Sequence, residues 1–222
     1  MDIKNNINFL QREVSAAGAQ LIAVSKTQPV ETIREAYDAG QRIFGENKAQ
    51  EMTAKVEALP RDIAWHMIGH LQTNKVKFIT PFVALIHSVD SQKLMDEINK
   101  QGKKVNRVIP CLLQVYIAQE ESKFGFDEQE LLSLLESPAI ADLDSLSVQG
   151  LMGMASLTTD KEKIRNEFKN LKNLFEKIKL RKLPGNVAMT ELSMGMSSDY
   201  KIALAEGSTL VRIGTAIFGD RR

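Results

Sequence analysis

A lysine that directly follows a run of mostly apolar residues is the side chain in this sequence best suited to covalent chemistry. Lys26 comes after residues 21–25, a segment with the length and composition of a buried strand. At the end of such a strand the lysine stem would lie among apolar walls, and partial desolvation favours the neutral, nucleophilic amine. The ordinary alternative for a lone lysine is a solvated or snorkelling side chain. Lys26 is therefore a candidate for imine formation with a carbonyl compound.

A serine-rich loop is the first of two segments suited to holding an anion. In residues 193–199, Gly195 allows a close approach of the backbone to a ligand. Ser193 and Ser197, with the N-terminus of a following helix, can donate hydrogen bonds to an anion. Asp199 is suited to cap that helix. Taken alone, the segment is equally explained as a polar loop before a capped helix.

The second such segment carries a fixed positive charge. Arg212 lies within the last apolar run, residues 210–213, and Gly214 and Thr215 follow it with a backbone suited to phosphate. A structural salt bridge is the alternative role for Arg212. The two segments would place hydrogen-bond donors and a cation on adjacent loops, which predicts a phosphate-binding site.

Other polar candidates are weaker. His66 and His70 are four residues apart, but no glutamate follows His66 as in a zinc-protease helix, so we expect structural or pocket-lining roles and no metal. His87 lies in an apolar segment and is expected to be a buried, hydrogen-bonded residue. Asn47 either faces a pocket or caps a helix, and Met152 to Met154 are expected in a pocket wall.

These residues need a scaffold, and the chain alternates eight short apolar segments with segments of helical pattern. Such alternation favours parallel strands with right-handed crossovers, covered by helices. A closed sheet leaves no free edge, so we predict a single α/β domain over residues 1–222, a (β/α)₈ TIM barrel; a doubly wound open sheet is the alternative. The expected strands are residues 21–25, 42–44, 63–68, 83–87, 108–115, 148–152, 187–192 and 210–213.

The helices are expected between these strands, and the barrel gives the candidate residues a common location. Function in such barrels gathers at the C-terminal ends of the strands, with phosphate often held after strands seven and eight. A first helix is expected to close the lower end of the barrel. The expected helices are residues 3–17, 29–40, 48–59, 71–78, 92–100, 127–136, 161–180 and 199–205.

Composition narrows the classes of partner. Lysine and arginine total 29 against 28 acidic residues, a net charge of +1, so we expect no nucleic acid or membrane partner. The single cysteine, Cys111, excludes an intrachain disulfide and is expected to be a buried small hydrophobe. No signal-peptide pattern or membrane-length apolar window is visible, so we expect a cytoplasmic protein, and balanced charge favours a monomer.

Seven segments together resemble the YggS/PROSC family of pyridoxal 5′-phosphate (PLP) homeostasis proteins, whose barrel is similar to the N-terminal domain of alanine racemase. The resemblance runs nearly end to end. The segments are 23–26 (AVSK), 44–47 (FGEN), 66–75 (HMIGHLQTNK), 87–90 (HSVD), 150–154 (GLMGM), 192–199 (LSMGMSSD) and 207–219 (GSTLVRIGTAIFG).

The resemblance implies a fold-type III PLP barrel that binds the cofactor covalently. Lys26 would carry PLP as a Schiff base, and Arg212 would face the pyridine nitrogen. It implies no catalytic residue and no metal ligand. The phosphate would be held by Ser193, Ser197, Gly214 and Thr215, and further cofactor contacts would come from Asn47, Met152, Gly195 and Met196.

One position departs from the family pattern. Tyr116 stands where a small polar residue, commonly asparagine, is expected. The following loop keeps the family-like Glu121 and Lys123. The departure therefore concerns only the detailed shape of the rim.

The expected function is PLP homeostasis or carriage to apo-PLP-enzymes rather than dedicated catalysis. An arginine at the pyridine nitrogen disfavours the protonated ring and weakens it as an electron sink. The alternative is a small fold-type III amino-acid racemase or related PLP enzyme. That enzyme would need a C-terminal β domain, which we expect to be absent, and a tyrosine as second base, for which Tyr200 is a better candidate than Tyr37 or Tyr116. A third class is a barrel that binds a sugar phosphate through Lys26 without PLP.

Overall fold

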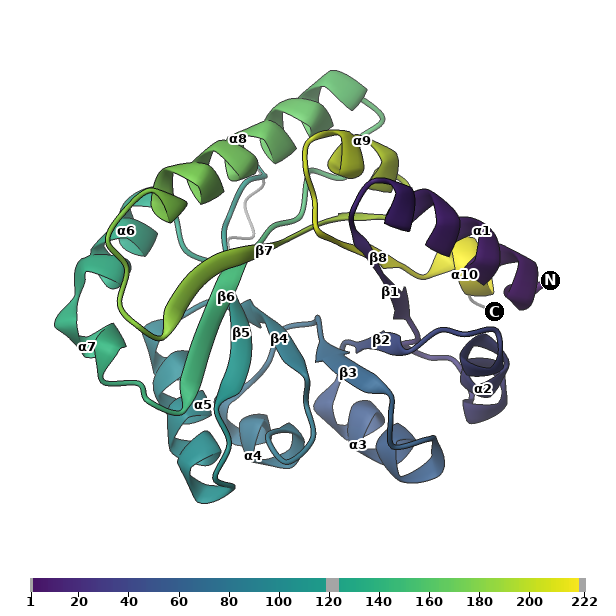
Figure 1. The fold of residues 1–222 in the computed structure, drawn as a ribbon, viewed down its shortest axis with the longest axis horizontal. Helices are drawn as coiled ribbons and strands as arrows, with labels where there is room; N and C mark the ends of the chain where they lie inside the picture. Colours follow the sequence, from purple (N-terminus) through teal and green to yellow (C-terminus); the bar gives the residue numbers. More distant parts are fainter. Residues whose placement is uncertain (1, 119–123, 220–222) are drawn as a thin grey trace.

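The computed structural model describes residues 2–118 and 124–219. Within them, eight parallel strands close into a barrel in sequence order, because β8 pairs back onto β1 (Figure 1). The predicted TIM barrel is thereby confirmed. The strands are β1 (Gln20–Val24), β2 (Ile43–Glu46), β3 (Ala64–Met67), β4 (Leu85–Val89), β5 (Ile109–Gln114), β6 (Leu146–Met152), β7 (Val187–Met196) and β8 (Leu210–Ile213).

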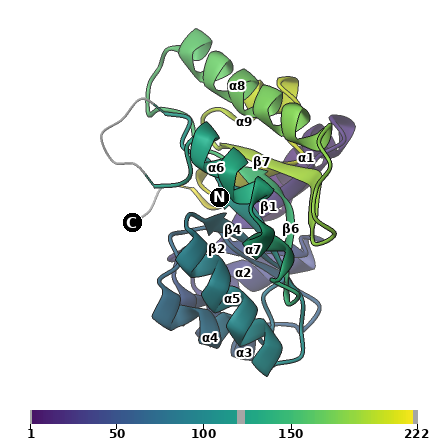
Figure 2. The ribbon, with the colours of Figure 1, turned by 90° about the vertical axis from the view of Figure 1, so that its left-hand side faces the viewer.

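Helices surround this barrel, and Figure 2 shows them on both sides of the strands, with α8 on one side and α3 to α5 on the other. No helix in the described ranges is long and apolar enough to cross a membrane. The helices are α1 (Ile3–Ala16), α2 (Val30–Asp38), α3 (Ala49–Ala58), the 3₁₀ turn η1 (Thr73–Lys75), α4 (Val76–Ile79), α5 (Gln92–Lys104), α6 (Glu128–Glu136), α7 (Pro138–Ala141), α8 (Lys161–Lys179), α9 (Tyr200–Ala205) and α10 (Thr215–Phe218).

Local sequence explains where the longer helices begin. Asp127 and Glu130 form a capping box at the start of α6, each side chain accepting from the backbone N–H of the other. Asp160 caps α8 through the backbone N–H groups of residues 162 and 163. Ile164, Phe168 and other buried residues three or four apart then give α8 one apolar face against the barrel.

The position of α1 differs from the expectation. Instead of closing the lower end of the barrel, α1 lies outside the strands and packs on β1, α2 and α10 (Figure 1). Asn6 donates a hydrogen bond to the backbone carbonyl of Ile217 in α10. α1 therefore supplies helical cover for β1, while α9 packs on β8.

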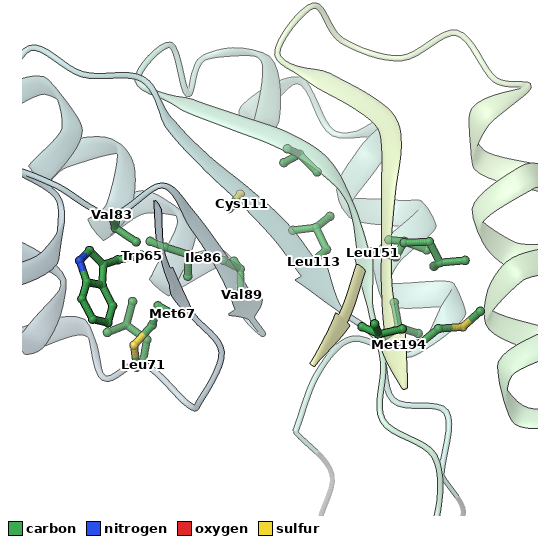
Figure 3. Close-up of a cluster of buried hydrophobic side chains, with 14 of the residues drawn as sticks. Trp65, Met67, Leu71, Val83, Ile86, Val89, Cys111, Leu113, Leu151 and Met194 are labelled. Carbon is green, nitrogen blue, oxygen red and sulfur yellow. The ribbon is translucent and has the colours of Figure 1, made fainter. Parts of the chain in front are cut away.

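The alternation of side chains along each strand creates two apolar cores. One face points into the barrel, where Ile22, Leu85, Leu112, Met152 and Leu210 pack together. The other face points toward the helices. That outer core contains Trp65, Met67, Leu71, Val83, Ile86, Val89, Cys111, Leu113, Leu151 and Met194 (Figure 3).

Cys111 belongs to the outer core and is fully buried. Burial raises the pKa of its thiol far above the ordinary range. The prediction that Cys111 is a small buried hydrophobe is confirmed.

Candidate functional site

A cavity of about 730 Å³ opens at the C-terminal ends of the strands, within the size range of small-molecule sites. Seven of the ten predicted ligand contacts line it: Lys26, Asn47, Met196, Ser197, Arg212, Gly214 and Thr215. The rest of the lining was not among these ten predicted contacts and consists of Val24, Gln28, Ile68, Met154, Leu157, Ser198, Ala216 and Gly219.

Lys26 reaches the cavity from the loop after β1. Ser25, its buried neighbour, continues the sheet by donating its backbone N–H to the carbonyl of Gly45, 3.0 Å away. Thr27, on the other side, has a φ of +66°, a left-handed conformation that is uncommon for a β-branched residue. Lys26 itself is half-buried, with Val24 beside it in the cavity wall. The backbone around the candidate nucleophile is therefore held in an unusual, specific shape.

Arg212 provides a buried cation in the cavity wall. Its side chain extends from β8, where it is 4% exposed. It donates to Ser193 Oγ at 2.5 Å and to the carbonyl of Gly153 at 3.1 Å. Burial lowers the pKa of Arg212 to about 10, against the opposing effect of Asp199. The guanidinium therefore stays charged near neutral pH, and these two hydrogen bonds go to uncharged oxygens rather than to a salt-bridge partner.

A buried polar chain continues from Arg212 across the barrel. Ser193 Oγ lies 2.9 Å from His87 Nδ1, and His87 Nε2 lies 2.9 Å from His66 Nδ1. Burial lowers the pKa of His66 to about 4 and holds that of His87 well below its ordinary value, so both rings are neutral at physiological pH. The prediction of His87 as a buried, hydrogen-bonded residue is confirmed.

Ser197 organises the wall that was predicted to bind an anion. Its Oγ accepts from the backbone N–H of Gly214 at 3.2 Å and of Ala216 at 3.5 Å. Gly214 packs closely on β1, since an added Cβ would lie 3.2 Å from the carbonyl oxygen of Val24. The loops after β7 and β8 are thus joined to each other and to β1.

Asp199 has a different role from the predicted helix cap. Its carboxylate makes no capping bond to α9 and instead accepts from the backbone N–H of Met196, 2.5 Å away. Gly195, near the end of β7, has a φ of +93°, a conformation that glycine adopts readily, and the turn over residues 197–199 follows it. The acidic group therefore shapes the loop that carries Ser197.

Three predicted contacts lie outside the cavity lining. Met152 packs in the inner core, 1% exposed. Ser193 lies fully buried between Arg212 and His87. Gly195 faces α9, where an added Cβ would lie 2.5 Å from the Cβ of Ala203.

The tyrosines considered as second bases in a racemase are engaged elsewhere. Tyr37 OH donates to Asp62 at 2.8 Å, and Tyr200 OH donates to Glu13 at 2.6 Å. Neither lines the cavity. Tyr116 does not line it either, and the neighbouring Glu121 and Lys123 lie outside the described residues.

The remaining histidine lies near the rim. His70 pairs with Asp90 at 3.0 Å on an exposed part of the molecule. Across residues 2–118 and 124–219, no group of three or more histidine, cysteine or acidic side chains is arranged to hold a metal ion.

Comparison with known proteins places this geometry in a family. A family model described as "Alanine racemase, N-terminal domain" matches residues 1–222. The "Pyridoxal phosphate homeostasis protein" of Aquifex aeolicus is 43% identical over 205 residues, covering 92% of this chain and 88% of the relative. The chain belongs to the pyridoxal phosphate homeostasis protein family. A second member, from Bos taurus, is 39% identical over 221 residues, covering 95% of this chain and 80% of its own.

Solved structures have the same fold as this chain. PipY of Synechococcus elongatus without PLP matches with a TM-score of 0.90 and 36% identity, covering 98% of this chain and 100% of PipY. PipY with PLP bound matches with a TM-score of 0.86 over the same shares of the two chains. Alanine racemase from Bartonella henselae, 19% identical over 99% of this chain and 58% of its own, has a TM-score of 0.71 and shows the shared fold alone. The resemblance read from the sequence is confirmed.

Proposed function

We propose that this protein binds PLP at the mouth of the barrel, as a Schiff base on Lys26, and serves PLP homeostasis or carriage. The observation that carries the proposal is that Lys26 and the buried Arg212 line one cavity, next to a wall of backbone donors and serines. Relatives named pyridoxal phosphate homeostasis protein, and a PipY structure with PLP bound, support the choice of ligand.

The residues present fit such a ligand. Gly214, Thr215 and Ser197 would hold the phosphate, Arg212 would face the ring nitrogen, and Asn47 would contact the ring. Met196 and the apolar residues Val24 and Ile68 also line the cavity and would exclude water from the ring. When bound, PLP supplies a reactive aldehyde and an aromatic ring that can accept electrons.

Arg212 limits what catalysis this site supports. Arginine only donates hydrogen bonds and stays protonated, so it disfavours a proton on the ring nitrogen. The Ser193 and Gly153 oxygens fix its guanidinium in place. This arrangement suits holding PLP better than stabilising a carbanion. A racemase would further need a proton-transfer group on the opposite face, and loss of optical rotation of a single amino-acid enantiomer would reveal one.

We further propose that the barrel acts as a cytoplasmic monomer, a single domain over residues 1–222, that passes PLP to apo-PLP-enzymes. The sequence supports the monomer in that it shows no obvious apolar stripe beyond the faces of its helices. Sedimentation would test the monomer. Reactivation of an apo-enzyme by the PLP-loaded protein, compared with an equal amount of free PLP, would test transfer.

The first experiment is an absorbance spectrum of the protein incubated with PLP, before and after borohydride, for wild type and Lys26→Ala. We expect a visible band that borohydride removes in wild type and that Lys26→Ala lacks, while the mutant retains weaker, phosphate-anchored binding. A reducible adduct in Lys26→Ala would show that another amine reacts. No band in wild type would contradict PLP binding and favour the sugar-phosphate barrel.

A further inference from the structure

A buried cluster of charged residues lies directly behind Lys26, outside the cavity lining. Lys55, on α3, is 5% exposed, and its ammonium donates to Ser25 O, Glu46 Oε1 and Glu51 Oε1, each at 2.7 Å. An ammonium has three N–H groups, so all three are used. Ser25 also donates its hydroxyl to Glu46 Oε1 at 2.6 Å. We call Glu46, Glu51 and Lys55 the clamp cluster.

The clamp cluster holds the backbone on both sides of Lys26. On the N-terminal side, Ser25 is bound through its carbonyl by Lys55 and through its hydroxyl by Glu46. On the C-terminal side, the backbone N–H of Thr27 donates to Glu51 Oε1 at 2.6 Å. Thr27 is the residue with the left-handed φ of +66°. The cluster therefore contacts the residue before Lys26 and the strained residue after it.

Stability alone is a weak explanation for the clamp cluster. Burying an ion pair costs desolvation that its attraction barely offsets, and a buried oxygen without a partner costs more. Among the described residues, Glu46 Oε2 is buried without a hydrogen-bond partner. Burial alone would raise the pKa of Glu51, but hydrogen bonds from Lys55 and Thr27 outweigh it and lower that pKa, so Glu51 is ionised. A costly, charged arrangement beside a strained loop fits a positioning role.

We propose that the clamp cluster positions Lys26, with Lys55 and Glu51 fixing the loop so that the lysine amine is presented to an aldehyde in the cavity. This inference rests on the proposed function. In the step concerned, the neutral amine nitrogen adds to the aldehyde carbon and a C=N bond forms. The aldehyde oxygen leaves as water with both amine protons, and no oxidant or reductant is required. Glu46, Glu51 and Lys55 touch neither reactant and are positioning residues.

The test compares two substitutions at one position, Glu51→Ala and Glu51→Gln. Glutamine keeps an oxygen for the Thr27 N–H but loses the charge, whereas alanine loses both. If Glu51 acted only through its charge, both variants would change the reaction alike. Positioning predicts that Glu51→Ala forms the borohydride-trappable bond with PLP about tenfold more slowly, while Glu51→Gln stays close to wild type. Glu57→Ala, at an exposed position on the same helix, is the matched control.

A second readout uses the protein without PLP. Hydrogen exchange at the Thr27 amide should be about tenfold faster in Glu51→Ala than in wild type, with Glu51→Gln in between. Thermal melting identifies variants that merely misfold. Equal bond-formation rates in Glu51→Ala and wild type, or unchanged exchange at Thr27, would overturn the inference. Absence of the bond in wild type would instead refute the proposed function, while the exchange measurement still decides whether the clamp holds the loop.

Discussion

His66 and His87 illustrate how burial sets the chemistry of single residues in this barrel. The two rings contact each other in the interior, with their centroids 5.1 Å apart. Desolvation disfavours the charged imidazolium, and each ring would repel a charge on the other. Both histidines are therefore neutral in the folded protein. Protonating either of them at low pH destabilises the folded state.

The first prediction at this scale concerns stability in acid. His66 has a folded pKa of about 4 against an ordinary value of 6.5, so between these values the unfolded chain binds more protons. The contribution of neutral His66 to the free energy of unfolding is complete above pH 6.5. It falls by roughly 3 kcal/mol as the pH drops toward 4. We expect His66→Gln to show a correspondingly smaller loss of unfolding free energy between pH 7 and pH 4. Urea titrations of both proteins at the two pH values check this, and identical losses would contradict it.

Lys26 and Arg212 could be found from the sequence because Lys26 directly follows one apolar segment and Arg212 lies within another. The sequence could not show how deep inside the barrel each of these side chains lies. Alternation indicates that Met152, Ser193 and Arg212 face inward, but the layer each occupies depends on the stagger between strands. The clamp cluster was missed because Glu51 and Lys55, four residues apart, look like an ordinary surface pair on a helix.

Among the elements, the end of β7 and the turn that leads into α9 are tightly constrained. Gly195 combines a left-handed φ of +93° with a close approach of α9, since an added Cβ would lie 2.5 Å from Ala203 Cβ and 3.1 Å from Tyr200 Cα. The same turn carries Ser197 to the cavity. Strain at this turn would therefore destabilise the fold and also displace Ser197, which organises the wall predicted to bind an anion.

Gly195→Ala is the prediction at this scale. We expect a loss of unfolding free energy of about 1–3 kcal/mol, because the new methyl group requires α9 to move and the backbone to hold an unfavourable conformation. Binding of PLP should weaken in parallel, since α9 cannot shift without moving Ser197. Chemical denaturation and a PLP titration measure both effects. Gly185→Ala, where an added Cβ has open space, is the control, and equal stability of the two variants would refute the account.

Strand positions were largely predictable, and the exceptions have local causes. The prediction ended β7 at residue 192, whereas the strand runs to Met196, because Ser193 and Met196 pair with Leu210 and Arg212 of β8. Gly195, of a residue type that usually weakens a strand, lies within a shift of the β7–β8 register between Ser193 and Met196, and the strand continues past it. The helix expected over residues 71–78 is a 3₁₀ turn followed by the single-turn α4.

At the scale of the whole molecule, the site joins the two ends of the strand order. Lys26 follows β1, and Arg212 belongs to β8, which pairs with β1 to close the barrel. The inner and outer cores then link every strand to its neighbours and to the helices. A ligand that contacts both strands should stabilise the barrel as a unit.

The matching prediction is that PLP raises the melting temperature of wild type. A ligand at 100 times its dissociation constant contributes about 2.7 kcal/mol, which for a chain of this size corresponds to roughly 5–10 °C. Lys26→Ala should gain less at equal PLP, because the covalent contribution is lost. Differential scanning fluorimetry with increasing PLP measures both. An equal gain in the two proteins would show that the covalent bond adds nothing to stability.

The polar chain across the barrel has a built-in direction. Arginine offers no acceptor, so the hydroxyl hydrogen of Ser193 must turn away from Arg212 and toward His87 Nδ1. His87 then carries its own hydrogen on Nε2 and gives it to His66 Nδ1. One residue therefore fixes the tautomers of both histidines, and moving a proton along the chain would reverse the direction of every hydrogen bond in it.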